Sequence, residues 1–412
     1  MTTAAKQYDV GGVLMPRPFK IRRFGHFGLN MERLDEAIAF YTDVLGFRIT
    51  DEVNILDKAP EELQPVLEAI VTDPRLIFTS NSGDHHALVL AHKTFGTLWG
   101  NDRKVQDITF SQTTFQLGSL QEVIDAEAYL RERGVEIGHY GRDMPGSNWE
   151  IYAYDPDDNM IELYYGMEQI GWQRKSKPFD MHYRGFMDVM PPLPQMSEAA
   201  ELHEALDKGI DTDSGWRPSE RHLEETHVVG GVLLPRPFKV TGIGPISMFT
   251  ERMDEMIEFY TDILGFEVVE EAELHGKRIV YLRTGTEHHT FVLADKSLRA
   301  TLGLSEHTSC MSIGLQVGSF SQLRDAVNLL MDQGYDFVHG LPQELYRGID
   351  YAAHLKDPDG HLLCLYYYME QIGWDGKPRP QSERREMSAP WPETLEPLSD
   401  TYSGTAYLGP LG

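Results

Sequence analysis

The chain has 412 residues, of which 41% are hydrophobic and 25% are charged, and its formal net charge at pH 7 is −27. Such a length allows two or more domains with hydrophobic cores of their own, whereas the strong negative charge argues against nucleic acid or an acidic membrane surface as a partner. The two cysteines, the polar amino-terminal segment and the lack of long apolar runs predict a cytoplasmic protein without a signal peptide or a disulfide framework.

The first predicted unit begins with a short strand at 26–30, which a helix follows. Apolar residues at helical spacing from Leu34 to Leu45 define one face of this helix. Gly46 is expected to end it, because glycine adopts the left-handed conformation without strain. Three strands are expected next, at 47–53, 75–80 and 87–91.

An insertion separates the first two of these strands. It contains Leu63, Val66, Leu67 and Ile70, whose spacing predicts a short amphipathic helix. Such a segment is either a lid over a site or an insertion on the surface with no role in the site, and the surface insertion is the simpler interpretation.

The second predicted unit repeats the same plan. A strand at 113–118 leads into Ser119 and Glu122, which form a capping-box pattern, and the helix that starts there ends at Gly134. Three strands follow at 135–140, 150–154 and 160–165. Each unit is therefore a strand, a helix and three strands.

The whole arrangement then occurs a second time. The segment 11–21 recurs at 230–240, and the hexapeptide at 167–172 recurs at 369–374, with the intervening motifs in the same order. The chain is thus expected to contain four βαβββ modules in two α+β domains, each a cup-shaped mixed sheet. We place their bounds at 11–172 and 230–374, with a linker that carries a short helix at 173–229 and an extended tail at 375–412.

These features resemble the vicinal oxygen chelate superfamily. The resemblance rests on the paired modules, on the pattern from His26 to Phe47 and on the stretch YAYDPDDNMIELY at 152–164. It covers both repeats, and four modules in one chain resemble the extradiol ring-cleaving dioxygenases most. In that superfamily two modules enclose a divalent metal, with ligands from the first strand of each module and from the last strand of the second.

The resemblance implies a metal site in the first repeat alone. There the ligand positions hold His26, Gln112 and Glu162, whereas the second repeat has no counterpart set; its residues at these positions are Pro245, Ser312 and Cys364. The extradiol enzymes usually carry their metal in the second domain, whereas the resemblance implies a metal site in the first domain of this chain. Gln112 also departs from the family pattern, which has a second histidine there.

The chemistry of these residues can also be weighed without the family. A carboxylate amid apolar neighbours, as Glu162 is, needs a cation or hydrogen-bond donors if it is buried; an exposed strand face or a salt bridge is the alternative. His26 alone would be a structural histidine as readily as a ligand. Gln112 is either an oxygen ligand, which would favour Mg(II) or Mn(II) over Fe(II), or an ordinary strand residue.

Two further residues take roles from the resemblance. His86 matches a histidine that faces the open side of the metal and acts as an acid or base. The second repeat keeps a histidine pair at 288–289 without ligands, which indicates a packing role for at least one histidine of each pair. Tyr152 matches a tyrosine that binds a substrate hydroxyl. His139 is the nearest candidate for an additional family histidine.

The resemblance therefore implies an Fe(II)-dependent extradiol-type dioxygenase that acts on a catechol-like aromatic and O2, with Mn(II) or Mg(II) as alternative metals. The same site is also compatible with a metal-dependent isomerase, lyase or hydrolase of the glyoxalase type. A non-catalytic protein that binds a small aromatic molecule is the third hypothesis. We expect a homo-oligomer.

Overall fold

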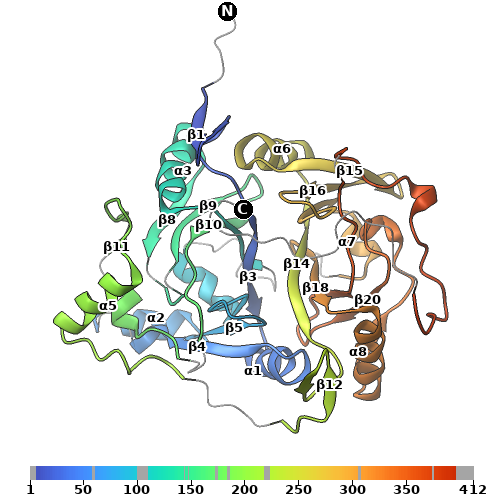
Figure 1. Ribbon diagram of the computed structural model, residues 1–412, viewed down its shortest axis with the longest axis horizontal. Helices are drawn as coiled ribbons and strands as arrows, with labels where there is room; N and C mark the ends of the chain where they lie inside the picture. Colours follow the sequence, from blue (N-terminus) through green and yellow to red (C-terminus); the bar gives the residue numbers. More distant parts are fainter. Residues whose placement is uncertain are drawn as a thin grey trace, which may run out of the picture.

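The computed structural model describes residues 6–57, 61–99, 110–142, 144–146, 148–171, 175–182, 186–217, 223–304, 308–373 and 375–395. The final part of the expected tail, 396–412, lies outside the described residues. Figure 1 shows the two repeats side by side, each built around its own sheet.

The sheet of the first repeat has nine strands. Their order is β11-β8-β9-β10-β7-β3-β6-β5-β4, so the two modules meet where β3 and β7 pair antiparallel. Within the modules, β3 pairs parallel with β6, and β7 pairs parallel with β10. The strands are β3 (Arg23–Met31), β4 (Arg48–Asn54), β5 (Arg75–Ser80), β6 (Leu88–His92), β7 (Phe110–Gln116), β8 (Ile137–Arg142), β9 (Trp149–Tyr154), β10 (Met160–Tyr165) and β11 (Phe186–Met187).

The sheet of the second repeat has eight strands in the equivalent order β15-β16-β17-β14-β18-β21-β20-β19. These are β14 (Val240–Thr250), β15 (Glu267–Leu274), β16 (Lys277–Arg283), β17 (Phe291–Asp295), β18 (Cys310–Val317), β19 (Phe337–Val338), β20 (Ala352–Lys356) and β21 (Leu362–Tyr366). The expected α+β fold of four βαβββ modules in two sheets is therefore confirmed.

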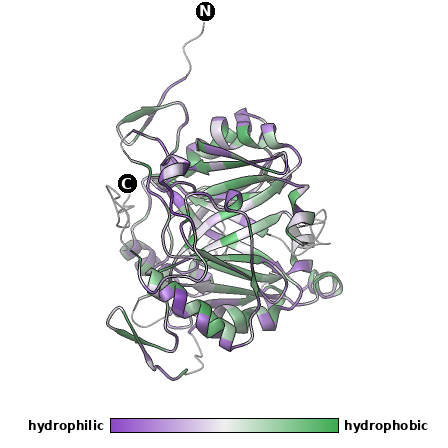
Figure 2. Ribbon diagram, turned by 90° about the vertical axis from the view of Figure 1, so that its right-hand side faces the viewer, coloured by the Kyte–Doolittle hydropathy of each residue, from purple (hydrophilic) through white to green (hydrophobic). Residues whose placement is uncertain are grey.

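Each module carries its helix where the sequence pattern predicts one. The helices are α1 (Leu34–Ala39), which continues as the π-helix η1 (Phe40–Val44), α3 (Leu120–Glu132), α6 (Met253–Glu258), which continues as η4 (Phe259–Leu264), and α8 (Phe320–Asp332). Ser119 caps α3 by accepting a hydrogen bond from the backbone N–H of Glu122. Figure 2 shows the hydrophobic strands enclosed by helices with hydrophilic outer faces.

The linker is more structured than the sequence indicated. Besides the expected helix, which is α5 (Glu198–Asp207), it contains α4 (Phe179–His182) and the two-residue strand β11, which pairs with β8 at the edge of the first sheet. A two-residue strand has no periodicity to detect, which is why composition alone suggested an irregular connection. Two hairpins outside the sheets were also missed: β1 (Tyr8–Val10) with β2 (Val13–Met15), and β12 (His227–Val229) with β13 (Val232–Leu234).

The insertion forms the expected helix, α2 (Gln64–Ile70). Its apolar side chains are largely exposed, with relative exposures of 48% for Leu63 and 53% for Val66. Short 3-10 segments lie beside it at η2 (Ile55–Asp57) and η3 (Lys93–Trp99). The remaining short elements are α7 (Leu298–Thr301), η5 (Gln343–Leu345) and η6 (Gln381–Glu383). No described helix is long and apolar enough to cross a membrane.

The two repeats share one hydrophobic core and bind each other reciprocally. Tyr41 of the first repeat donates a hydrogen bond to Asp357 of the second over 3.0 Å, and Tyr260 of the second donates to Asp155 of the first over 3.1 Å. All four side chains are buried. Burial and the adjacent aspartate raise the pKa of both tyrosines well above the ordinary value, so their hydroxyls remain donors.

Candidate active site

One row of cross-strand neighbours crosses the first sheet and carries most of the candidate residues. From β8 to β3 the row reads His139, Tyr152, Glu162, Thr114 and His26, each paired in register with the next. Side chains of directly paired residues project from the same face of a sheet. Three of the five predicted site residues therefore meet on the inner face of the cup.

Glu162 is the centre of this cluster. It is fully buried, and its carboxylate accepts hydrogen bonds from Gln112 Nε2 at 2.9 Å, Thr114 Oγ1 at 3.1 Å and Asn148 Nδ2 at 2.8 Å. The Nε2 atom of His26 lies 3.0 Å from Glu162 Oε2. These contacts compensate for the loss of water around a buried carboxylate. They also bring the three predicted ligands, His26, Gln112 and Glu162, together.

The spacing of these atoms fits a divalent metal ion. Ligand atoms at ~2.0–2.1 Å from an octahedral ion lie roughly 3 Å apart when they are adjacent, which matches the distances from Glu162 to His26 and to Gln112. Within the described ranges, no group of three His, Cys, Asp or Glu side chains could hold a metal. A metal at this cluster would need a third ligand of another type, and the amide oxygen of Gln112 can point toward Glu162 after rotation of the amide by half a turn.

A second buried cluster links Asp51, His85 and His86. His85 Nε2 lies 3.3 Å from Asp51 Oδ2, and the Nδ1 atoms of His85 and His86 lie 3.0 Å apart. With both rings neutral, His85 donates to Asp51, so His85 Nδ1 accepts and His86 Nδ1 donates. Nε2 is then the unprotonated nitrogen of His86. Burial, followed by the nearby His26 and His85, holds the pKa of His86 well below the ordinary value.

His85 and His86 face different surroundings. The ring of His86 lies 4.2 Å from that of His26 and lines the pocket described below, whereas His85 does not line it. The second repeat repeats the pairing: His288 Nε2 lies 3.1 Å from Glu270, and its Nδ1 atom lies 3.1 Å from that of His289. A histidine pair anchored by a carboxylate is therefore common to both cups.

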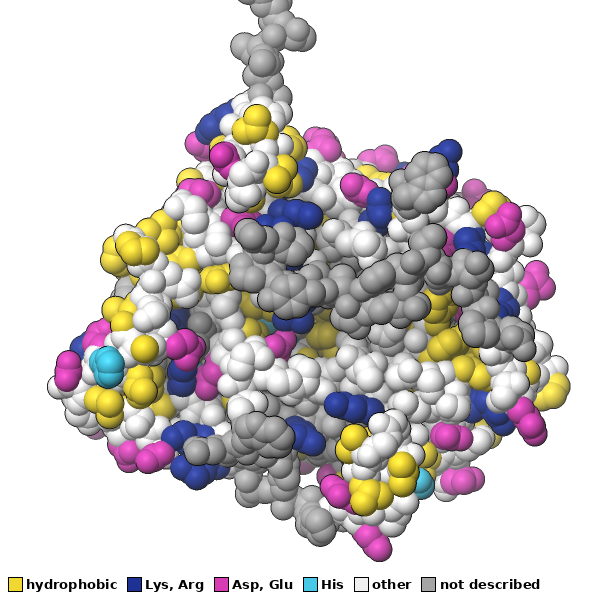
Figure 3. Space-filling model, in the orientation of Figure 1, with side chains coloured by type: hydrophobic (Ala, Val, Ile, Leu, Met, Phe, Trp, Pro, Cys, Tyr) yellow, Lys and Arg dark blue, Asp and Glu magenta, His cyan; other side chains and the backbone are white. Residues whose placement is uncertain are grey.

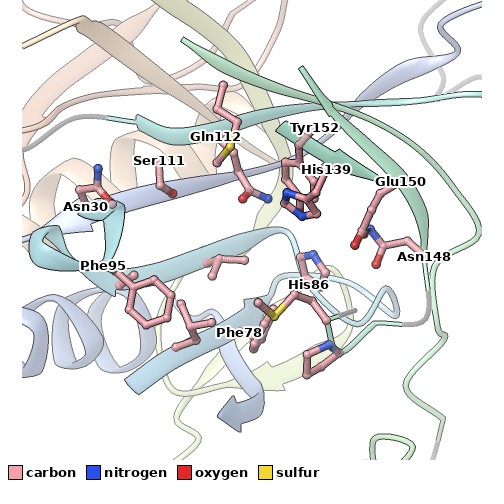
Figure 4. Close-up of a pocket in the computed structure, with 17 residues that line it drawn as sticks. Asn30, Phe78, His86, Phe95, Ser111, Gln112, His139, Asn148, Glu150 and Tyr152 are labelled. Carbon is pink, nitrogen blue, oxygen red and sulfur yellow. Dashed lines mark hydrogen bonds between the residues drawn. The ribbon is translucent and has the colours of Figure 1, made fainter. Parts of the chain in front are cut away.

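A largely apolar pocket opens beside the cluster (Figure 4). Its empty space, including the open mouth, is about 780 Å³. Polar side chains face it from the strands, and hydrophobic ones complete the wall. The described residues that line it are Asn30, Leu76, Phe78, His86, Val89, Ala91, Phe95, Gly96, Ser111, Gln112, His139, Met144, Pro145, Asn148, Glu150, Tyr152 and Met160.

Several of these residues were missed in the sequence. Asn148 Nδ2 donates to Glu150 at 2.7 Å as well as to Glu162, so one amide bridges two buried carboxylates. His139, which the sequence indicated as a candidate histidine, also lines the pocket and stacks on Tyr152 with ring centres 4.2 Å apart. The alternation 148, 150, 152 along a predicted strand could have placed Asn148 and Glu150 beside Tyr152.

A β-bulge explains why neighbouring residues of β7 share one face. Gly28 pairs with Gln112 but the next residue, Leu29, pairs with Phe110, so Ser111 is the extra residue of β7. A bulge redirects side chains that would otherwise alternate. Ser111 and Gln112 therefore both line the pocket.

The cup of the second repeat is filled instead. Cys364, at the position of Glu162, is buried in an apolar cluster that includes Leu345, Tyr346 and Met311. Burial raises the pKa of its thiol to about 12, which keeps it neutral. A neutral thiol packed among hydrophobic side chains is a poor metal ligand.

Gly146 packs against the ring of His86 and leaves no room for a side chain at position 146. It has a φ of +109°, and a Cβ atom there would lie 2.9 Å from His86 Cε1. We expect Gly146→Ala to lower the free energy of unfolding by about 1–3 kcal/mol and to displace His86, reducing activity. Gly134→Ala is the control, because Gly134 has a φ of +72° with nothing within 4 Å of its added Cβ. Urea unfolding and turnover measure both variants; equal turnover in the two would contradict the contact with His86.

The comparisons with known proteins agree with this architecture. The chain is 23% identical over 268 residues to catechol-2,3-dioxygenase from Bacillus subtilis (strain 168), a match that spans 64% of this chain and 72% of that protein. The fold is similar to that of the 2,3-dioxygenase LapB from Pseudomonas sp. KL28, with 13% identity, a TM-score of 0.54 and coverage of 87% of this chain and 96% of that one. It is also similar to the Mn(II)-bound glyoxalase from Novosphingobium aromaticivorans, with 14% identity, a TM-score of 0.52 and coverage of 87% and 85%.

The family model is matched by both repeats. The matched residues are 23–163 and 242–365, which together exceed half of the chain and span the two cups. The chain therefore belongs to the Glyoxalase/Bleomycin resistance protein/Dioxygenase superfamily.

Proposed function

We propose that this protein is a metal-dependent dioxygenase that cleaves the ring of a catechol-like aromatic with O2. The observation that carries the proposal is the meeting of His26, Gln112 and Glu162 beside an apolar pocket that Gln112, His86 and Tyr152 line. A relative from Bacillus subtilis with the name catechol-2,3-dioxygenase supports the reaction class.

In this proposal each residue has a defined task. His26, Glu162 and Gln112 would hold the metal, which would supply coordination sites for two vicinal oxygens of the substrate and for O2. Tyr152 would hydrogen-bond a substrate hydroxyl. His86, through Nε2, would accept a substrate proton and later return it. The apolar wall would bind the ring and exclude water from it.

The amide of Gln112 favours a second candidate. Amide oxygen suits Mg(II) or Mn(II) better than Fe(II), and the Mn(II)-bound glyoxalase has a similar fold. In this case the enzyme would be an isomerase, lyase or hydrolase that polarises a substrate oxygen without O2.

Metal analysis separates the two candidates. The chain is purified anaerobically, its metals are determined by mass spectrometry, and O2 uptake is recorded with a panel of catechols. Iron together with O2 uptake is expected for the dioxygenase. Manganese or magnesium, with no O2 uptake by iron-loaded protein, would overturn it in favour of the second candidate.

Gln112→His supplies a sharper test of the metal preference. An imidazole at this position completes a set of two histidines and one carboxylate, so we expect the affinity for Fe(II) relative to Mg(II) to rise by about tenfold or more. Competitive metal titration measures the ratio. Ser312→His, at the matched position of the filled cup, should leave it unchanged. An unaltered ratio in Gln112→His would show that residue 112 is not a ligand.

A further inference from the structure

The pocket has a second polar end, away from His86. Figure 4 shows Asn30 and Ser111 at one side, with His86, Asn148 and Glu150 at the other. Hydrophobic side chains, among them Val89 and Phe95, form much of the remaining wall, and Gln112 lies between the two ends. A ligand that fills the pocket therefore meets polar groups at both of its ends.

Asn30 is an unusual residue to find in this wall. It is 4% exposed, and its Oδ1 atom is buried without a hydrogen-bond partner among the described residues. A buried amide oxygen without a partner costs about 1–3 kcal/mol. Because the side chain lines the pocket, a bound ligand can supply the missing donor.

The strand positions set the length of that ligand. His26 and Asn30 lie on the same face of β3 and are four residues apart, so their Cα atoms are ~13 Å apart at about 3.3 Å per residue. Gly28 lies between them, and a Cβ atom there would lie 2.1 Å from Ser111 Oγ. The glycine therefore lets Ser111 lie against β3, between the proposed metal ligands and Asn30.

The second repeat has lost this polar pair along with the ligands. By the strand register, the positions of Asn30 and Ser111 hold Phe249 and Met311. Both are buried in the apolar cluster that fills the second cup. The polar pair thus belongs to the first repeat, and hydrophobic side chains stand at both positions in the second.

We propose that Asn30 and Ser111 form a distal subsite that binds a neutral hydrogen-bond donor, such as a hydroxyl, at the far end of an elongated apolar substituent on the aromatic diol. The inference rests on the proposed function, which places the reacting ring at the His86 end of the pocket, next to His26. Glu150, the one acidic side chain among the described lining residues, lies at the other end, so the distal group is uncharged.

Anaerobic titration calorimetry with the metal-loaded protein tests the subsite without turnover. The probes are catechol, 4-hexylcatechol and 4-(6-hydroxyhexyl)catechol, whose extended chain bridges the span along β3. We expect the terminal hydroxyl to tighten binding by about tenfold. Asn30→Leu should abolish this gain and leave the affinity for catechol unchanged, and Ser111→Ala should reduce it by about threefold.

The variants include their own controls. Phe249→Leu, at the matched position of the filled cup, should keep the full gain, and thermal unfolding checks that each variant is folded; Ser111→Ala serves if Asn30→Leu does not fold. An equal gain in the wild type, Asn30→Leu and Ser111→Ala overturns the subsite, as does a failure of both alkylcatechols to bind.

Turnover then distinguishes the two levels of the proposal. If the hydroxyl preference depends on Asn30 but no O2 is consumed, the subsite stands and ring cleavage is wrong. If O2 is consumed equally with both alkylcatechols and in Asn30→Leu, ring cleavage stands and the subsite is wrong.

Discussion

Glu162→Gln is expected to remove the bound metal and to lower turnover by at least about 100-fold while the fold persists. Glu162 is the anionic member of the proposed ligand set, and losses of this size already follow from changes outside the first coordination shell. The substitution keeps the shape of the side chain but removes the charge on which Asn148, Thr114 and Gln112 converge. Metal content per chain and turnover with a catechol measure the effect.

The matched control is Cys364→Ala in the second repeat. Cys364 occupies the equivalent strand position but lies among hydrophobic side chains. Its replacement should leave metal content and turnover unchanged. Retention of one metal per chain by Glu162→Gln would remove Glu162 from the ligand set.

Phe115→Ala is expected to lower the free energy of unfolding by about 3–5 kcal/mol, the usual cost of removing a buried phenyl ring. Phe115 is fully buried in the first repeat, and its ring packs 5.2 Å from that of Phe266 in the second repeat. The loss therefore weakens both repeats at once. Urea unfolding, monitored by circular dichroism, measures it.

The outcome also reports how the repeats unfold. Leu14→Ala, at a residue that is 70% exposed, should change the free energy by less than about 0.5 kcal/mol. A single transition that shifts as a whole in Phe115→Ala indicates one cooperative unit. Two separate transitions, with only one affected, would contradict the shared core.

The fold was predictable from the sequence because each module contains local sequence signals for its own helix and strands. The spacing of apolar residues predicted the positions of the helices. Gly46, predicted to end the first helix, has a φ of +89° in the structure, and Ser119 makes the hydrogen bond that the capping pattern predicted. Because the chain is duplicated, the same sequence signals occur in both repeats and predict the same elements. What the sequence lacked was any signal for β11, since a two-residue edge strand depends on its neighbour and not on its own pattern.

The site was predictable only in part. The family resemblance, together with the differences between the repeats, pointed to His26, Gln112 and Glu162, and the strand register does bring them together. Ser111 could not be assigned, because alternation from Gln112 would turn it away and only the bulge turns it back. Thr114 also has no distinguishing pattern; its contact with Glu162 follows from parallel pairing between strands far apart in the chain.

The reciprocal bonds between the repeats have a consequence for the history of the chain. The tyrosine of each FYTD segment pairs with the aspartate of the DPD segment in the other repeat, so each half carries both surfaces of one interface. Two copies of a single half could dock in the same way, as an isologous dimer with a two-fold axis. Joining the copies in one polypeptide fixes the second half as a permanent scaffold, and that half can then lose its ligands without loss of the partnership.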